Sequence, residues 1–141
     1  MRVLGLDLGA RRIGVAVSDP MGWTAQGLAT IQRRSEQQAI DEIRRVVGEL
    51  GVERIVVGLP RNMDGTIGPQ ARKVLTFAAR LRETLGIPVD AWDERLTTVA
   101  ARKSMTETRL SRARRKLTVD RIAAQLILQG FLDSLRAPAS R

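Results

Sequence analysis

The segment VLGLDLGARRIGVAV, residues 3–17, decides the fold class of this chain. It holds two short apolar runs, residues 3–8 and 13–17, joined by the tetrapeptide at residues 9–12, which begins with glycine. Two apolar runs with a short glycine-containing connection are typical of a β-hairpin. We therefore expect the chain to begin with two antiparallel strands.

Strand and helix patterns alternate along the rest of the chain. Short apolar runs predict further strands at residues 28–31, 55–57 and 89–92. Apolar residues at helical spacing predict helices over residues 35–50, 69–85, 96–103 and 118–135. Residues suited to helix ends flank these segments: Ser35, Gly51, Pro69, Gly86 and Thr118. A hairpin followed by strand–helix units predicts an α/β fold, a mixed five-stranded sheet flanked by helices on both faces.

The length of 141 residues is close to the commonest size of a single domain. We expect residues 1–136 to form one domain and residues 137–141 a loose C-terminal tail. Apolar stretches stay well short of the roughly 18 residues of a membrane span. With no signal-peptide pattern at the start either, we expect a cytoplasmic protein with no membrane partner.

Missing residue types exclude several kinds of chemistry. The chain contains no Cys, no His and no Tyr. Disulfides, thiolate nucleophiles and cysteine metal sites are therefore excluded, as are imidazole bases and Ser-His-Asp triads. Catalysis would have to come from carboxylates, Lys, Ser, Thr, backbone amides or a metal held by oxygen.

The charge balance points to a polyanionic partner. There are 24 Lys and Arg against 15 Asp and Glu, which gives a formal net charge of +9. Residues 102–116 carry seven basic residues and one acidic residue, or +6 of that total. We interpret this stretch as a mobile segment that grips the phosphate backbone of a nucleic acid. A basic but merely solvated surface is the alternative.

Asp7 is the first of three acidic residues that call for an explanation. It lies inside an apolar strand, where alternation places it on the same face as Val3 and Gly5. A carboxylate there is costly unless a cation or hydrogen-bond donors compensate it. A structural, hydrogen-bonded aspartate is the alternative to a metal ligand.

Glu94 and Asp120 are the other two. Glu94 follows the strand predicted at residues 89–92, at the carboxyl end where α/β sheets usually place their sites. A solvated acid paired with Arg95 is the alternative for Glu94, and Asp93 competes with it for the same role. Asp120 is expected at the buried edge of the last helix and in its first turn, where the helix dipole alone could explain it.

Three acids from a first strand, a later strand end and a last helix suggest a metal centre. Oxygen ligands suit Mg²⁺ or Mn²⁺ and disfavour zinc. Two such ions can orient a water molecule and stabilise a leaving oxygen, and so cleave a phosphodiester. We therefore expect Asp7, Glu94 and Asp120 to be the catalytic and metal-binding residues of a nuclease that uses Mg²⁺ or Mn²⁺, with two ions.

Four segments resemble the YqgF/RuvX family: residues 4–19, residues 57–60 with 64–66, residues 93–98 and residues 119–124. The resemblance covers nearly the whole chain in order. It implies an RNase H-like fold related to the RuvC-type Holliday junction resolvases, and phosphodiester cleavage that depends on Mg²⁺ or Mn²⁺. The acidic positions of the family fall on Asp7, Glu94 and Asp120. The resemblance also implies a substrate, either the 5′ end of pre-16S ribosomal RNA or a four-way DNA junction.

Candidate nucleic-acid contacts are the basic residues beside these segments and two residues of the loop at 58–68, which leads into a helix N-terminus. They are Arg11, Arg12, Arg61, Asn62, Arg102, Lys103, Arg109, Arg112, Arg114, Arg115 and Lys116. For the loop, a glycine-rich turn required only by geometry is the alternative.

We expect processing of the 5′ end of pre-16S ribosomal RNA, with resolution of four-way DNA junctions as the first alternative. Nucleotide phosphotransfer and a non-catalytic role in nucleic-acid binding or ribosome assembly are the others. Cutting both strands of a junction symmetrically requires a homodimer, whereas a monomer can trim RNA.

Overall fold

The computed structural model describes residues 1–96 and 112–136, with the backbone alone for residues 112–118. Its elements follow in the order β1 (Val3–Leu8), β2 (Arg12–Ser18), β3 (Ala25–Gln32), α1 (Glu36–Leu50), β4 (Arg54–Leu59), α2 (Pro69–Leu85), β5 (Val89–Asp93), a 3₁₀ turn η1 (Glu94–Leu96) and α4 (Arg112–Arg136). The predicted strands and three of the four predicted helices are confirmed. The helix predicted over residues 96–103 lies, apart from Leu96, outside the described residues, as does the expected tail at 137–141.

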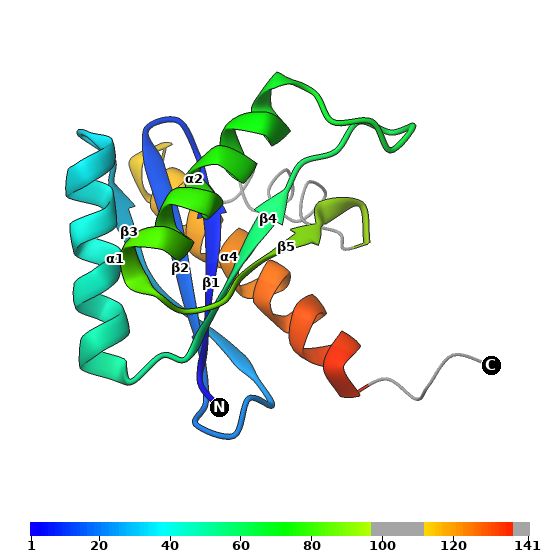
Figure 1. Cartoon of the computed structure of the whole chain (residues 1–141). Helices are drawn as coiled ribbons and strands as arrows, with labels where there is room; N and C mark the ends of the chain where they lie inside the picture. The colour runs from blue at the N-terminus through cyan, green and yellow to red at the C-terminus, as the bar shows by residue number, and fades with distance from the viewer. Residues whose placement is uncertain (97–111, 137–141) are drawn as a thin grey trace.

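The five strands form one mixed sheet in the order β3-β2-β1-β4-β5 (Figure 1). β1 pairs antiparallel with β2, and β2 with β3, as the hairpin predicted. β4 pairs parallel with β1 and with β5. The carboxyl ends of β1, β4 and β5 therefore lie along one edge of the sheet, together with the start of β2.

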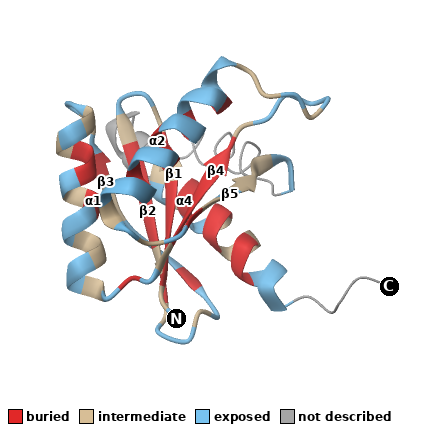
Figure 2. Cartoon of the chain, viewed as in Figure 1, coloured by how far each residue is buried: buried red, intermediate tan, exposed pale blue. Residues whose placement is uncertain are grey.

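Helices cover both faces of the sheet (Figure 2). α1 and α2 pack on one face with the large aliphatic side chains of the strands, among them Leu4, Leu6 and Val57. α4 packs on the other face with smaller residues such as Val3 and Ala16. In β4, Ile55, Val56 and Val57 are all fully buried, because the strand is covered on both faces.

Local sequence signals set the ends of α1 and α2. The Ser35 side chain accepts a hydrogen bond from the amide of Gln38, whose side chain in turn accepts from the Ser35 amide, which makes a capping box. Gly51 and Gly86 end the two helices in the left-handed conformation, with φ of 64° and 69°. Pro69 occupies the first turn of α2.

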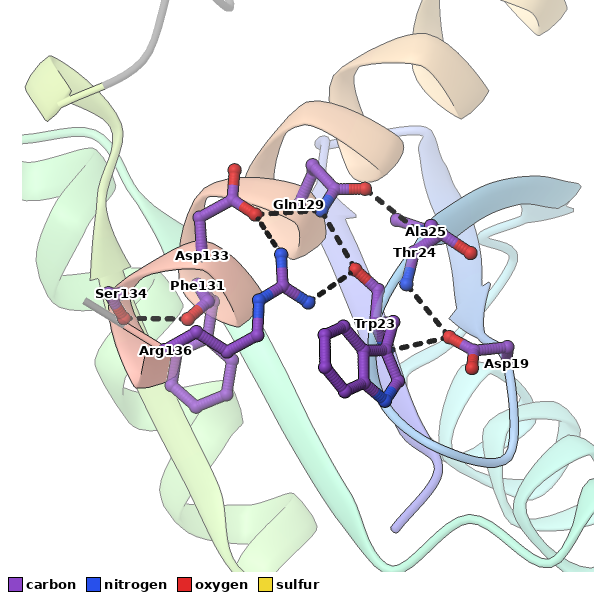
Figure 3. Close-up of polar contacts among 9 residues, drawn as sticks. All are labelled: Asp19, Trp23, Thr24, Ala25, Gln129, Phe131, Asp133, Ser134 and Arg136. Carbon is purple, nitrogen blue, oxygen red and sulfur yellow. Dashed lines mark hydrogen bonds and ion pairs between the residues drawn. The ribbon is translucent and has the colours of Figure 1, made fainter. Parts of the chain in front are cut away.

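The last turns of α4 are anchored to the connection between β2 and β3 (Figure 3). The Gln129 side chain accepts a hydrogen bond from the Ala25 amide at 2.9 Å and donates one to the Trp23 carbonyl at 3.2 Å. Arg136 donates to the same carbonyl at 2.8 Å, and its guanidinium lies 5.0 Å from the centroid of the Trp23 ring. These contacts fix how α4 crosses the sheet.

The same connection is organised by Asp19. Its carboxylate accepts hydrogen bonds from the backbone amides of Trp23 at 2.7 Å and Thr24 at 2.8 Å (Figure 3). These bonds, the one from Thr24 above all, lower the pKa of Asp19. Asp19 follows the end of β2, which runs antiparallel to β1, so it lies at the edge of the sheet opposite the end of β1.

Candidate active site at the carboxyl edge of the sheet

Asp7 lies near the end of β1 on the face that α4 covers. It shares this face with Val3, which packs in the α4 core, whereas Leu4, Leu6 and Leu8 pack under α1 and α2. The predicted alternation is therefore confirmed. In the antiparallel ladder the partner of Asp7 is Gly14 of β2. Gly14 lies next to Asp7 in the sheet and also contacts the last helix, α4.

α4 approaches the backbone of the sheet directly at Gly14. A Cβ atom built on Gly14 would lie only 2.0 Å from the backbone oxygen of Asp120, so no other residue fits without moving the helix. The absence of a side chain at this position lets α4 come close to the strand next to Asp7. Asp120 is thereby held beside the end of β1.

The Glu94 carboxyl lies on the same face of the sheet, beside Gly58 near the end of β4. A Cβ atom built on Gly58 would lie 3.2 Å from the carboxyl carbon of Glu94 and 2.4 Å from Ile127 of α4. Since Ile127 belongs to the core under α4, the Glu94 carboxyl also lies on that side of the sheet. β4 is the direct neighbour of β1. Asp7 and the Glu94 carboxyl therefore lie on the α4 face near one edge of the sheet, and the backbone of Asp120 packs against Gly14 at the same edge.

Asp93, the competitor of Glu94, is engaged elsewhere. Both of its carboxylate oxygens accept hydrogen bonds from the Arg95 guanidinium, at 2.7 to 3.1 Å. This bonding lowers the pKa of Asp93 and raises that of Arg95. Arg95, the partner that the sequence offered for Glu94, forms an ion pair with Asp93. Asp93 and Glu94 are adjacent in sequence but have different surroundings. Asp93 bonds Arg95, whereas the Glu94 carboxyl lies beside Gly58.

Asp120 lies deeper in α4 than the sequence predicted. The helix begins at Arg112, not near Thr118, so Asp120 is more than one turn from its start and the dipole explanation is wrong. Ala124 and Leu128, one and two turns further on, are fully buried. Asp120 is therefore in line with the buried face of α4, and its side chain is 15% exposed.

Arg12 is the ion-pair partner of Asp120. Its Nε donates to a carboxylate oxygen of Asp120 at 2.8 Å, across 108 positions of sequence. Arg12 begins β2, directly after the turn that follows Asp7. In this conformation, the described part of the chain holds no group of three acidic side chains close enough to bind a metal ion as they stand. Binding of one ion by Asp7, Glu94 and Asp120 would therefore require these side chains to move closer together.

The loop before α2 carries Arg61 and Asn62, two predicted nucleic-acid contacts. Arg61 is exposed, whereas the Asn62 side chain donates to the Thr66 hydroxyl at 2.9 Å and so helps to close the loop. Asp64 accepts from the same hydroxyl at 2.7 Å, which is the main cause of its lowered pKa. Arg95 donates to the carbonyl of Met63 at 3.4 Å and connects this loop to the end of β5.

The sequence did not predict that Arg95 connects the loop before α2 to the end of β5. The signal was present in the Asp-Glu-Arg triplet at residues 93–95, because an arginine two positions after an aspartate can turn back onto it. Its long-range contact with Met63 could not be seen, since the two residues are 32 positions apart.

The predicted basic segment is described only in part. Arg102, Lys103 and Arg109 lie outside the described residues. Residues 112–116 form the start of α4, so the backbone at this end of the segment is helical, while its mobility and its contact with a phosphate backbone stay predictions. Of the remaining candidates, Arg11 is exposed in the turn between β1 and β2.

Comparison with known proteins identifies the family. Residues 1–134 match the family described as "RuvX: Holliday junction resolvase". The chain belongs to the RuvX family. It is 56% identical over 135 residues to a protein of Clostridium novyi (strain NT) named "Putative pre-16S rRNA nuclease", covering 96% of this chain and 100% of that one. A Clostridium botulinum (strain Hall) protein of the same name is also 56% identical, over 96% of this chain and 98% of its own. RuvX membership makes the chain a nuclease, that is, a hydrolase acting on ester bonds.

Solved structures show that the RuvX chain has the RNase H-like fold of RuvC-type resolvases. Thermus thermophilus RuvC in complex with a Holliday junction substrate matches with a TM-score of 0.55 at 16% identity, over 97% of this chain and 96% of that one. Fowlpox virus resolvase in complex with substrate Holliday junction DNA matches with a TM-score of 0.57 at 11% identity, over 97% and 100%. The RNase H-like architecture expected from the sequence is confirmed.

Proposed function

We propose that this RuvX-family chain is a metal-dependent nuclease that processes the 5′ end of pre-16S ribosomal RNA in the cytoplasm. The proposal is supported by the approach of β1, η1 and α4, which carry Asp7, Glu94 and Asp120 to the α4 face near the carboxyl edge of the sheet. The pre-16S substrate is suggested by the names of the relatives from two Clostridium species.

The residues at this edge suit a hard divalent cation. All three side chains offer carboxylate oxygens, the ligands that Mg²⁺ and Mn²⁺ prefer, and the chain contains no Cys or His that would favour zinc. We propose two such ions, held by Asp7, Glu94 and Asp120. When bound, these ions lower the pKa of a water molecule and neutralise charge on the leaving oxygen.

Arg12 gains a role in this scheme. It neutralises Asp120 in the present conformation, at 2.8 Å. If Asp120 held a cation, the guanidinium of Arg12 would be able to bind another anion beside it. Arginine binds phosphate oxygens well through two parallel hydrogen bonds. Arg12 would then hold the phosphodiester, and the exposed Arg11 and Arg61 are further candidate contacts.

Holliday junction cleavage is the second candidate. It is favoured by the description of the matched family and by the fold shared with T. thermophilus RuvC. Symmetric cleavage of a four-way junction needs two active sites related by a twofold axis, and hence a homodimer. A monomer in solution would therefore argue against junction cleavage, whereas a homodimer is compatible with both candidates.

The deciding experiment offers purified protein a pre-16S RNA and a synthetic four-way junction in parallel, each with Mn²⁺, with Mg²⁺ and with chelator. We expect cleavage near the 5′ end of the mature 16S sequence, abolished by chelator, from a protein of monomer mass. Paired nicks in the junction by a dimer would instead support the resolvase. Binding of both nucleic acids without cleavage of either would leave the non-catalytic assembly factor.

A further inference from the structure

A pocket of about 670 Å³ opens on the side of the sheet opposite the three acids. It lies between the first turns of α1 and α2 and the turn that joins β1 to β2, which meet at the same end of the molecule (Figure 1). Its volume is in the range of sites that take a small organic molecule or one nucleotide.

The wall of this pocket is strongly basic. Arg33, Arg34 and Lys73 line it. The one acidic residue in the lining, Glu36, is ion-paired with Arg80 of α2. The pocket therefore favours an anion.

One of the three cations is held in place before any ligand arrives. Arg33 donates to the carbonyl of Gly9 at 2.8 Å, and its guanidinium lies over the ring of Phe77, 4.7 Å from the centroid. Arg34 and Lys73 are exposed on either side. A fixed guanidinium with two adaptable cations is suited to phosphate oxygens.

The floor of the pocket is apolar. Leu8, Val74 and Phe77 are buried members of the core under α1 and α2, and all three line the pocket. The first turns of both helices also reach it, and their dipoles add favourable potential for an anion. A ligand that combines a phosphate with a flat, weakly polar ring would match both the wall and the floor.

The pocket and the three acids share one short turn. Gly9 and Ala10 line the pocket, and Asp7 lies two residues before Gly9, on the other face of the sheet. Two residues of strand span about 7 Å. A polynucleotide strand that crosses the edge of the sheet at this turn therefore passes from the pocket to Asp7 within a few nucleotides.

We propose that this pocket binds a single unpaired nucleotide of the substrate strand, a few nucleotides from the phosphodiester that is cut. The inference rests on the proposed nuclease function and adds a requirement to it. Arg34 and Lys73 hold the phosphate, and the base stacks on the guanidinium of Arg33, which itself lies over the Phe77 ring. A base can enter only where the strand is unpaired, so the substrate must be single-stranded on that side of the cut.

The test measures binding and not cleavage, so that it stands apart from the test of the nuclease. The full-length Asp7→Asn protein is titrated with a fluorescent 12-nucleotide single-stranded RNA. The pocket variant adds Arg34→Ala and Lys73→Ala. The matched control adds Arg44→Ala and Arg45→Ala, which removes the same charge from exposed positions further along α1.

We expect the pocket variant to raise the Kd at least about ten-fold and to lower the salt slope by about 0.7 units, the value for one phosphate of a single strand that is no longer neutralised. The control should change the Kd less than about two-fold. Gln70→Trp, which fills the pocket without altering charge, should weaken binding as the pocket variant does. Thermal unfolding of all variants should match the parent, because the replaced side chains are exposed.

Three results would contradict the proposal that this pocket binds an unpaired nucleotide of the substrate. One is equal behaviour of the pocket variant and its control. Another is an equally large loss with a 12-base-pair RNA duplex, which would mean a general phosphate-binding surface. The third is binding of AMP alone as tight as that of the RNA, which would mean a site for free nucleotides. If wild-type protein cleaves RNA while the pocket variant matches its control, this inference fails and the proposed function stands.

Discussion

The two faces of the sheet are built from different residues and serve different ends. Under α1 and α2 the core consists of large side chains such as Leu6, Ile43 and Leu81, all fully buried. Under α4 the sheet presents Gly14 and Gly58 near its carboxyl edge, and the helix lies directly against the backbone. The first face provides buried apolar area, while the second lets charged groups from distant segments meet. Changes on the two faces should therefore affect different measurements.

The largest effect is expected from Asp7→Asn on the α4 face. Cleavage should fall about a thousand-fold, or about 4 kcal/mol of transition-state stabilisation, because a proposed carboxylate ligand is lost. The free energy of unfolding should stay within about 1 kcal/mol of the parent, since the side chain keeps its shape. Steady-state cleavage together with urea unfolding measures both, with Asp41→Asn on α1 as control. Near-normal turnover by the folded variant would remove Asp7 from the site.

Leu81→Ala tests the opposite face. Its side chain is fully buried between α2 and the sheet, so truncation should cost about 3 kcal/mol of unfolding free energy through lost contacts and a cavity. Cleavage per folded molecule should not change, because Leu81 lies away from the carboxyl edge. Thermal unfolding and an assay well below the midpoint give the two values. A large loss of activity in fully folded protein would show that the faces are not separable in this way.

Substitutions of Gly14 and Gly48 compare a glycine that α4 packs against with a glycine exposed on α1. Gly14→Ala places a methyl group 2.0 Å from the backbone of Asp120, so we expect a loss of about 2 kcal/mol in stability and a fall in activity as α4 moves away. Gly48→Ala, on exposed α1, meets nothing within 4 Å and should stabilise by about 0.5–1 kcal/mol at unchanged activity. Equal effects of the two substitutions would contradict the close approach of α4.

The smallest effect concerns the ion pair of Asp93 with Arg95. Arg95 lowers the pKa of Asp93 in the folded state. The ion pair therefore stabilises the protein at pH values above 3.8, the ordinary pKa of an aspartate. This contribution is lost as the pH falls through the lowered value. The stability difference between the parent and Asp93→Asn should therefore be present at neutral pH and vanish once the pH falls below the lowered pKa of Asp93. A difference that persists in strong acid would show that the carboxylate charge is not its source.

Much of the fold follows from local patterns. The period of two in residues 3–8 predicted both the first strand and the face on which Asp7 lies. Ser35, Gly51, Pro69 and Gly86 marked the ends of α1 and α2, because each satisfies backbone groups or angles within a few residues. The start of α4 was placed too late, since the basic residues 112–116 carry no apolar periodicity although they are helical. The part of the chain that the structure describes contains no helix long and apolar enough to span a membrane.

By itself, the sequence determined the order of strands and helices, the absence of thiol and imidazole chemistry, and a short list of acids that could act together. Only the tertiary structure decided which of Asp93 and Glu94 turns toward α4, and that Arg12 pairs with Asp120. It also decided that the β1–β2 turn stands between the three acids and a basic pocket. Backbone periodicity acts over a few residues and can be seen in one segment, whereas these contacts depend on how closely α4 packs onto the glycines of two separate strands.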